Sequence, residues 1–296
     1  MVDAEQSLKL RPSNVSDADK VGTIIFNAFS TIAQRHGFTS DFPSIDIAKD
    51  TSMSLLSNPN FYSVIAEEDN SVIGINFLDE RSNKVAGIGP LAVDPKSQNK
   101  GVGRQLMINT MQRSRGKNFA GIRLLQASYH NRSLALYASL GFETREPIST
   151  MQGKPIQAAI PGRTVRTATI DDVDYCNDIC QQIHGHDRNG EIIDSIKQGS
   201  AKVVIHLGKI ITGYTCGLDF FNHSVGMTND DLKALIASVA TDDGNYGGSG
   251  ILISTRNTQL FHWSLNNGLR LVQQLLLMTV GMYNEPAGSY MPSILY

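Results

Sequence analysis

The sequence predicts a mixed α/β fold with two tandem modules of one kind, each built on a mostly antiparallel central sheet. Three observations lead to this prediction. The length of 296 residues suits two domains of ordinary size. Apolar residues change between helical and strand spacing along each half of the chain. Several positions of the first half reappear, in order, in the second half.

The repeat is visible at both ends of the modules. In the first half, a strand pattern at residues 10–12 leads into a helix that begins near residues 17–19. The second half repeats this arrangement, with a strand pattern at residues 165–167 and a helix that begins near residues 172–174. Later matches keep a near-constant offset, and they pair Asn131 with Asn257, Tyr137 with Trp263, Gly141 with Gly268, and Met151 with Met278. We therefore predict a first module over residues 1–152 and a second over 164–296. The linker, 153–163, holds the turn residues Gly153, Pro155, Pro161 and Gly162.

The elements of the first module follow from periodicity and from capping residues. Ser16 or Asp17 is expected to cap the first long helix, and Thr169 or Asp171 its counterpart in the second module. The predicted elements are, in order, a strand over 8–11, helices over 17–35 and 45–56, strands over 61–67, 71–79 and 86–93, a helix over 101–115, a strand over 122–127, a helix over 131–140, and a strand over 143–151.

The composition argues against several classes of protein, including nucleic-acid-binding, membrane-spanning and disulfide-rich proteins. Asp and Glu number 28 against 26 Lys and Arg, so the net charge of −2 offers no basic surface for nucleic acid. No stretch approaches the roughly 20 apolar residues of a membrane span, and residues 1–11 do not resemble a signal peptide. Three cysteines, an odd number, give no disulfide framework and fit a reducing compartment. A cytoplasmic protein that binds neither nucleic acid nor membrane is expected.

The most informative segment follows the strand pattern at Leu91, Ala92 and Val93. It consists of Gln98, Asn99, Lys100, Gly101, Val102, Gly103 and Arg104, and it leads into a predicted helix. Free backbone N–H groups at a helix N-terminus favour a phosphate group. The glycines let a pyrophosphate approach the backbone, and Lys100 and Arg104 add positive charge. The spacing is that of neither the P-loop nor the dinucleotide fingerprint.

This segment resembles motif A of the GNAT superfamily of acyl-CoA N-acyltransferases, whose pattern is Gln/Arg-x-x-Gly-x-Gly/Ala. The resemblance extends to Asn131, Tyr137 and the Leu140–Phe142 turn, and it covers about residues 8–152. It implies acetyl-CoA as cosubstrate, with the pyrophosphate on the amides of residues 98–104 and the pantetheine arm along residues 91–93. Asn131 is carried over as a further cofactor-binding residue.

The resemblance also implies a direct transfer to an amine in a ternary complex. Tyr137 would protonate the departing thiolate, and a backbone N–H near residues 91–93 would polarise the thioester. Glu80 is the predicted base, with Asp79 and His36 as rivals, and a solvated turn carboxylate is an equally good reading of Glu80. The first module has no cysteine, so a cysteine acyl-enzyme there is excluded.

The expected acceptor is a small-molecule or peptide amine, and the region 37–56 is expected to form part of its site. The sequence does not select among amines, and it leaves the oligomeric state open. Two alternatives remain: a non-catalytic acyl-CoA-binding regulator on the same fold, and a structural interaction protein.

The second module is predicted to be an inactive copy. The matching helix begins at Thr228–Asp231, which resembles a capping box, and Asn229 is a possible cap. Asp230 and Asp231 would repel a pyrophosphate there, and Trp263 replaces the tyrosine. Cys176 and Cys180 lie near two histidines, but their spacing favours core packing, so no metal is expected. One coenzyme A per chain follows, and the second module is expected to shape the acceptor site.

Overall fold

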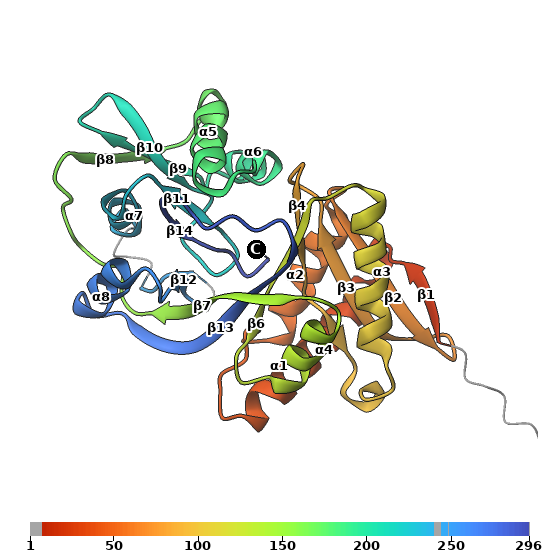
Figure 1. Cartoon of the computed structure of the whole chain (residues 1–296). Coiled ribbons are helices and arrows are strands. Elements are labelled where there is room, and N and C mark those ends of the chain that lie inside the picture. The colour runs from red at the N-terminus through yellow and green to blue at the C-terminus, as the bar shows by residue number, and fades with distance from the viewer. Residues whose placement is uncertain (1–7, 240–243, 248, 296) are drawn as a thin grey trace, which may run out of the picture.

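The computed structural model describes residues 8–239, 244–247 and 249–295, and it contains two lobes joined by shared strands (Figure 1). The first half contributes β1 (Lys9–Pro12), α1 (Ala18–Arg35), α2 (Ile45–Ser57), β2 (Phe61–Glu68), β3 (Ser71–Asp79), β4 (Val85–Ile88), β5 (Ala92–Val93), α3 (Val102–Gly116), β6 (Gly121–Ala127), α4 (Asn131–Ser139) and β7 (Glu143–Gln152). The second half contributes β8 (Arg163–Thr167), α5 (Val173–His184), α6 (Asn189–Gln198), β9 (Lys202–His206), β10 (Ile210–Thr215), β11 (Ser224–Gly226), α7 (Asn229–Ile236), β12 (Ile251–Ser254), α8 (Thr258–Asn266), β13 (Arg270–Gly281) and β14 (Ser289–Met291).

Both halves begin with the same local structure. In the first, Asn14 and Asp17 form a capping box around a short 3-10 helix (Val15–Asp17), and Arg11 pairs with Asp17 at 2.9 Å. In the second, Thr169 and Asp172 do the same, and Arg166 pairs with Asp172 at 2.6 Å. The repeat is thus present in side-chain contacts as well as in order. The N-cap of α1 is Asp17, one of the two predicted residues, although its side chain makes no capping hydrogen bond to α1. The N-cap of α5 is Asp172 rather than Thr169 or Asp171, and Asn14 and Thr169 cap the short 3-10 helices that precede α1 and α5.

The strands form two sheets, and most neighbours run antiparallel as predicted. One sheet has nine strands in the order β1-β2-β3-β4-β6-β13-β7-β12, with β5 paired to β3, and the other has the order β14-β11-β10-β9-β8. The pairing of β4 with β6 is parallel. The larger sheet therefore contains strands from both halves of the chain.

Strand β13 of the second half lies between two strands of the first half. It pairs with β6 from Leu275↔Ala127 to Gly281↔Gly121, and on its other edge it pairs with β7. Strand β7 in turn pairs with β12. In Figure 1 this long strand runs beside β7 along the lower edge of the left-hand lobe toward β6. The sheet thus crosses the predicted linker, and the division of the chain at residues 153–163 stays a prediction.

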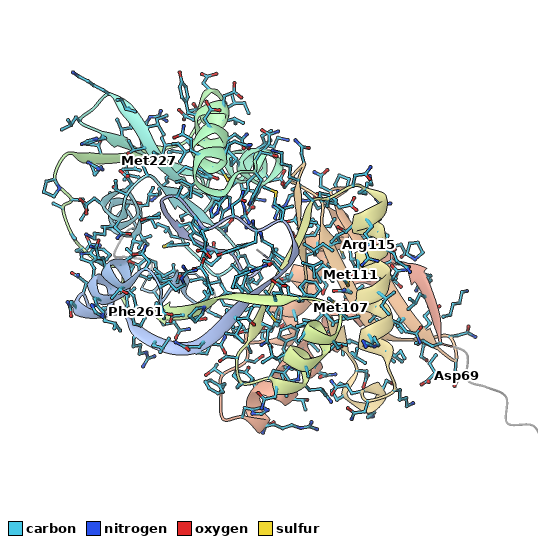
Figure 2. The ribbon with its side chains drawn as sticks, in the orientation of Figure 1. Asp69, Met107, Met111, Arg115, Met227 and Phe261 are labelled. Carbon is cyan, nitrogen blue, oxygen red and sulfur yellow. The ribbon has the colours of Figure 1, made fainter. Side chains whose placement is uncertain are left out.

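Two groups of helices cover opposite faces of the larger sheet. Helices α1 and α2 pack on buried residues of β2, β3 and β5 such as Ile65 and Phe77. Helix α3, with Met107 and Met111 on the side that faces the sheet, packs with α4 on the other face (Figure 2). Side-chain alternation on β6 directs Leu124 toward α3 and α4, and Leu125 toward Phe220 and Leu275 of the second half.

The predicted strand over residues 86–93 is interrupted, and this interruption creates the site. The β4–β6 ladder ends at Gly87↔Arg123, and the chain resumes as β5 on β3 alone. Pro90 lies between them and has no N–H to donate to a ladder. Residues 88–93 therefore diverge from residues 124–127. No helix among the described residues is long and apolar enough to cross a membrane.

Candidate active site

A cavity of about 320 Å³ opens between the diverging strand segments. Its described lining comes from both halves and comprises Ala28, Phe29, Ile32, Asp41, Phe42, Ile88, Gly89, Pro90, Leu91, Val93, Gln98, Asn99, Gly101, Val102, Gly103, Arg104, Leu124, Leu125, Gln126, Ala127, Tyr129, His130, Arg132, Ser133, Leu136, Tyr137, Phe220, Phe221, Leu275, Ile294 and Leu295. Most of the predicted motif residues and Tyr137 thus meet at one cavity.

The N-terminus of α3 has free backbone donors at one end of this cavity. Gly101 is the N-cap, its φ of 84° is left-handed, and among the described residues no side chain caps the helix. The first amides of α3 therefore remain available for an anion. Gln98 lies beneath the loop and donates from Nε2 to the carbonyl of Val93 at 3.0 Å, which ties the loop to the strand before it.

Two arginines supply positive charge at this end. Arg104 lines the cavity and donates to Ser139 Oγ at 3.1 Å. Arg132 also lines it and donates to Asn99 at 2.9 Å and to Gln98 at 2.6 Å. Sequence analysis missed Arg132, although it directly follows Asn131. Lys100 points elsewhere, since its ammonium pairs with Glu68 at 3.3 Å and its side chain is half exposed.

Tyr137 lies buried on α4, against the cavity. Burial raises the pKa of its hydroxyl to about 12, although its hydrogen bond with Ser133 acts in the opposite direction. The tyrosine therefore holds its proton at neutral pH and can donate it. His130 lies nearby, with Nδ1 2.7 Å from Ser133 Oγ, and burial lowers its pKa to about 4. It is neutral under the same conditions.

Four residues that the sequence placed in the site do not line the cavity. Ala92 packs under α1, Asn131 is exposed at the start of α4, and Lys100 pairs with Glu68. Glu80 accepts two hydrogen bonds from Arg113, at 2.7 and 3.0 Å. Strand alternation explains Ala92, because Leu91 and Val93 face the cavity and the residue between them faces the opposite side.

The rivals of Glu80 differ in their surroundings. Asp79 accepts from Arg81 at 2.6 Å and lies outside the lining. His36 lies 5.2 Å from the ring of Tyr129, at the edge of the cavity but not in its lining. Thus none of the three residues that the sequence offered as a base, Glu80, Asp79 and His36, lines the cavity.

Asp41 is the carboxylate that the cavity does contain. It belongs to the loop between α1 and α2, and it accepts from Gln273 Nε2 of β13 at 2.8 Å. Burial raises its pKa to about 6, and the hydrogen bond from Gln273 partly offsets this. Ser249 of the second half also donates to its backbone carbonyl at 3.3 Å. A carboxylate with this pKa is ionised at neutral pH and close to the range suited to a base.

The first half of the chain matches the model of the acetyltransferase (GNAT) family over residues 25–142. Residues 25–142 thus carry the sequence pattern of this family. No curated protein matches its sequence, and the further comparisons are with solved structures.

Several solved GNAT-like structures share the fold over nearly the whole chain. A protein of Pyrococcus horikoshii assigned as an acetyltransferase has a TM-score of 0.71 at 15% identity, over 96% of this chain and 94% of its own. A GCN5-related N-acetyltransferase of Sphaerobacter thermophilus has 0.61 at 12%, over 94% and 96%. A tandem GNAT protein from the clavulanic acid biosynthesis pathway has 0.58 at 12%, over 93% and 98%. The predicted fold, two tandem GNAT-like modules, is confirmed.

The second GNAT-like module has a different helix start. Thr228 caps α7, and the buried Asp231 accepts from the Thr228 backbone N–H at 2.9 Å and from its hydroxyl at 2.8 Å. Arg163 pairs with the same carboxylate at 2.6 Å. Asn229 is not the cap, since its carbonyl oxygen accepts from Asn257 at 2.7 Å. The carboxylate of Asp231 thus occupies the N-terminus of α7, the position that corresponds to the predicted phosphate site of the first module.

One group in the second GNAT-like module has metal-ligand residue types. Candidate ligand atoms of Glu191, Cys216 and His223 lie within 4.8 Å of one another. However, Glu191 contacts Arg188 at 2.9 Å and His223 Nδ1 at 2.8 Å, and His223 Nε2 lies 2.8 Å from the Tyr214 hydroxyl. A guanidinium in direct contact disfavours a cation. We interpret the group as a buried polar network.

Proposed function

We propose that the protein is an N-acyltransferase that carries an acetyl or other acyl group from acyl-CoA to a primary amine. The observation that carries this proposal is the uncapped start of α3 at one end of a cavity that also contains a buried, protonated tyrosine. The free amides, with Arg104 and Arg132, suit the pyrophosphate. The gap between β4–β5 and β6 leaves room for the pantetheine arm and the thioester.

The proposed reaction is a single transfer within a ternary complex. The amine nitrogen attacks the thioester carbonyl carbon, and a C–N bond forms while the carbonyl electrons move to oxygen. The tetrahedral intermediate then collapses, the C–S bond breaks, and the sulfur takes the proton of Tyr137. The nitrogen loses its extra proton to a base. Tyr137 recovers a proton from solvent when the products leave.

We assign the base to Asp41. It lines the cavity, whereas Glu80 is bound to Arg113 outside it. A group must reach the reacting nitrogen, directly or through one water, before its pKa matters. Among the described residues of the lining, Asp41 offers the one carboxylate.

Thiol release from acetyl-CoA in the presence of a panel of primary amines tests this function. We expect amine-dependent release of free coenzyme A, together with an N-acetylated product seen by mass spectrometry. Binding of acetyl-CoA with no transfer to any amine would instead support a non-catalytic acyl-CoA-binding regulator. Absence of acetyl-CoA binding would favour a structural interaction protein.

A further inference from the structure

The cavity has an apolar wall on the side away from α3 and α4. Phe29 and Phe42 of the first half lie there, in the hydrophobic cluster beneath α1 and α2. Phe220, Phe221 and Leu275 of the second half belong to a neighbouring cluster on the same side. The phosphate loop and Tyr137 lie at the other side. Because the donor would occupy the side with the phosphate loop and Tyr137, the apolar wall lies on the side that remains for the acceptor.

The second half holds its part of this wall in a fixed position. The Phe221 backbone N–H donates to Asp219 Oδ1 at 2.7 Å, which closes the turn before β11. The Ile294 backbone N–H donates to the Phe220 carbonyl at 2.9 Å. The two phenylalanine rings pack edge to face, 5.7 Å apart. These contacts preorganise a rigid aromatic surface before any ligand arrives.

Charge is distributed unevenly along the cavity. Arg104 and Arg132 lie at the phosphate end, whereas Asp41 lines the cavity directly before Phe42 in the chain and accepts a hydrogen bond from Gln273. Gln126 lines the cavity too, and neither atom of its buried amide has a hydrogen-bond partner among the described residues. A partly buried carboxylate beside an apolar wall favours a ligand that brings one positive charge on an apolar body.

We propose that the acceptor is a small primary amine on an apolar body, such as an arylalkylamine or a branched alkylamine. Its ammonium group pairs with Asp41 on binding and loses one proton through Asp41 to solvent, so that the neutral amine attacks and Asp41 can take the second proton afterwards. Its hydrocarbon part packs on Phe220, Phe221 and the first half's aromatic residues. This inference rests on the proposed function and specifies its substrate class. It also gives the second half a role, which is to select the acceptor.

Competing occupants fit the wall less well. A long acyl chain has no cation, so it would leave Asp41 facing hydrocarbon. A polyamine or an amino sugar carries several charges or hydroxyl groups, and those that face the phenylalanine side chains of the wall would lose their hydrogen bonds to water without replacement. A cavity of about 320 Å³ is at the small end of ligand pockets, and it must also admit the thioester, which favours a small acceptor.

The first test compares matched amines with acetyl-CoA as donor. We expect kcat/KM for 2-phenylethylamine and isopentylamine to exceed that for ethanolamine, putrescine and glucosamine by at least about tenfold, the effect of one or two lost apolar contacts. Octanoyl-CoA should not outperform acetyl-CoA. Equal or better turnover of the polar amines, or a preference for octanoyl-CoA, would overturn the inference and leave the transferase function in place.

The second test changes the wall and leaves the donor site intact. Phe221→Ala should raise KM for 2-phenylethylamine about tenfold or more without changing the Kd for acetyl-CoA. Phe261→Ala is the matched control, because Phe261 lies on α8 of the second half, outside the cavity lining (Figure 2). A Phe221→Ala variant with unchanged amine KM would remove the second half from the acceptor site.

A binding measurement separates this inference from the proposed function. In calorimetry on the protein saturated with coenzyme A, 2-phenylethylamine should bind more tightly than ethanolamine. If no amine is acetylated but this preference holds, the transferase function fails and the amine site stands. If neither amine binds, the amine site is refuted.

Discussion

Gly103 lies in the first turn of α3, where an added side chain would enter the cavity. A Cβ there would be 3.7 Å from Leu136 and 3.8 Å from Val93, which are ordinary contact distances. The fold therefore tolerates a side chain at Gly103, while a bound pyrophosphate would not. Gly101 differs, since its φ of 84° strains any other residue regardless of space.

Gly103→Glu should weaken acetyl-CoA binding by more than tenfold, about 1.4 kcal/mol or more, because a carboxylate would occupy the place of a phosphate. Calorimetry measures the Kd. Gly116→Glu is the control, because Gly116 is at the opposite end of the same helix with open space around it. Equal affinity in both variants would exclude the α3 N-terminus from the donor site.

Tyr137→Phe should lower kcat by about 10²-fold and leave the Kd for acetyl-CoA near that of the parent, because only the proton for the leaving thiolate is lost. Steady-state kinetics and calorimetry together measure the two effects. Tyr62→Phe is a matched control outside the cavity, where the hydroxyl donates to Asn109 at 2.8 Å. A kcat like that of the control would mean that water or another group protonates the thiolate.

Asp41 links activity to pH. Burial raises its pKa to about 6, so a base role predicts that kcat/KM falls as the pH drops through about 6. Asp41→Asn should lose this limb of the profile, whereas Asp46→Asn, on the exposed side of α2, should keep it. A parent profile without this limb would contradict the assignment.

The stability of the fold should respond to Asp41 in the opposite sense. A folded-state pKa above the unfolded value means that the folded state binds the proton more tightly. The stabilisation from the protonated form is present at low pH and is lost as the pH rises through about 6. Asp41→Asn should therefore be at least as stable as the parent at pH 8, as measured by urea unfolding.

At the scale of elements, β13 connects the two halves. It lies between β6 and β7, and Leu277 on it is 1% exposed while Leu271 is 43% exposed. The strand also brings Gln273 to Asp41 and Leu275 to the cavity wall. One strand thus completes the sheet and places two side chains at the proposed acceptor site.

Leu277→Ala should lower the free energy of unfolding by about 2–5 kcal/mol, because it leaves a void in a packed interior. Leu271→Ala, on the same strand, should change it by no more than about 0.5 kcal/mol. Chemical denaturation gives both values. A small effect at Leu277 would mean that the shared sheet contributes little to stability.

At the scale of the whole molecule, the two halves share a fold but differ at one helix start. Helix α3 begins with unpaired amides, and α7 begins with the Thr228–Asp231 capping box, which Arg163 reinforces. A phosphate at α7 would have to displace a buried carboxylate from its partners and face its charge. We therefore expect the two modules to differ in function although they share a fold.

We accordingly expect one molecule of coenzyme A per chain. Titration calorimetry on the full chain gives the stoichiometry. Gly103→Glu should abolish all of the binding signal, whereas it would remove only half of that signal if each module bound one coenzyme A. Two equivalent sites, or one site that survives in this variant, would show that the second module binds the donor.

Local sequence patterns were enough to predict most elements of the first module, although the strand predicted over residues 86–93 is interrupted. The strand over residues 71–79 has the predicted bounds, and the helix predicted over 45–56 ends one residue later at Ser57. The Gln98–Arg104 segment, apart from Lys100, and Tyr137 line one cavity, and their roles there stay a prediction. Such features depend on the spacing of neighbouring residues, on glycines and on capping groups, and these are written in consecutive positions.

Contacts between distant positions were decided by the tertiary structure alone. The insertion of β13 between β6 and β7, the approach of Phe220 and Phe221 to the cavity, and the hydrogen bond from Gln273 to Asp41 join residues far apart in the chain. No local period encodes such a pairing. Glu80 shows the same limit, because its sequence position fits a base, yet Arg113 of α3 reaches it from another element and holds it outside the cavity. The sequence by itself determined most of the elements and the prediction of a phosphate-binding motif. Packing of the two halves determined which carboxylate and which aromatic side chains complete the cavity.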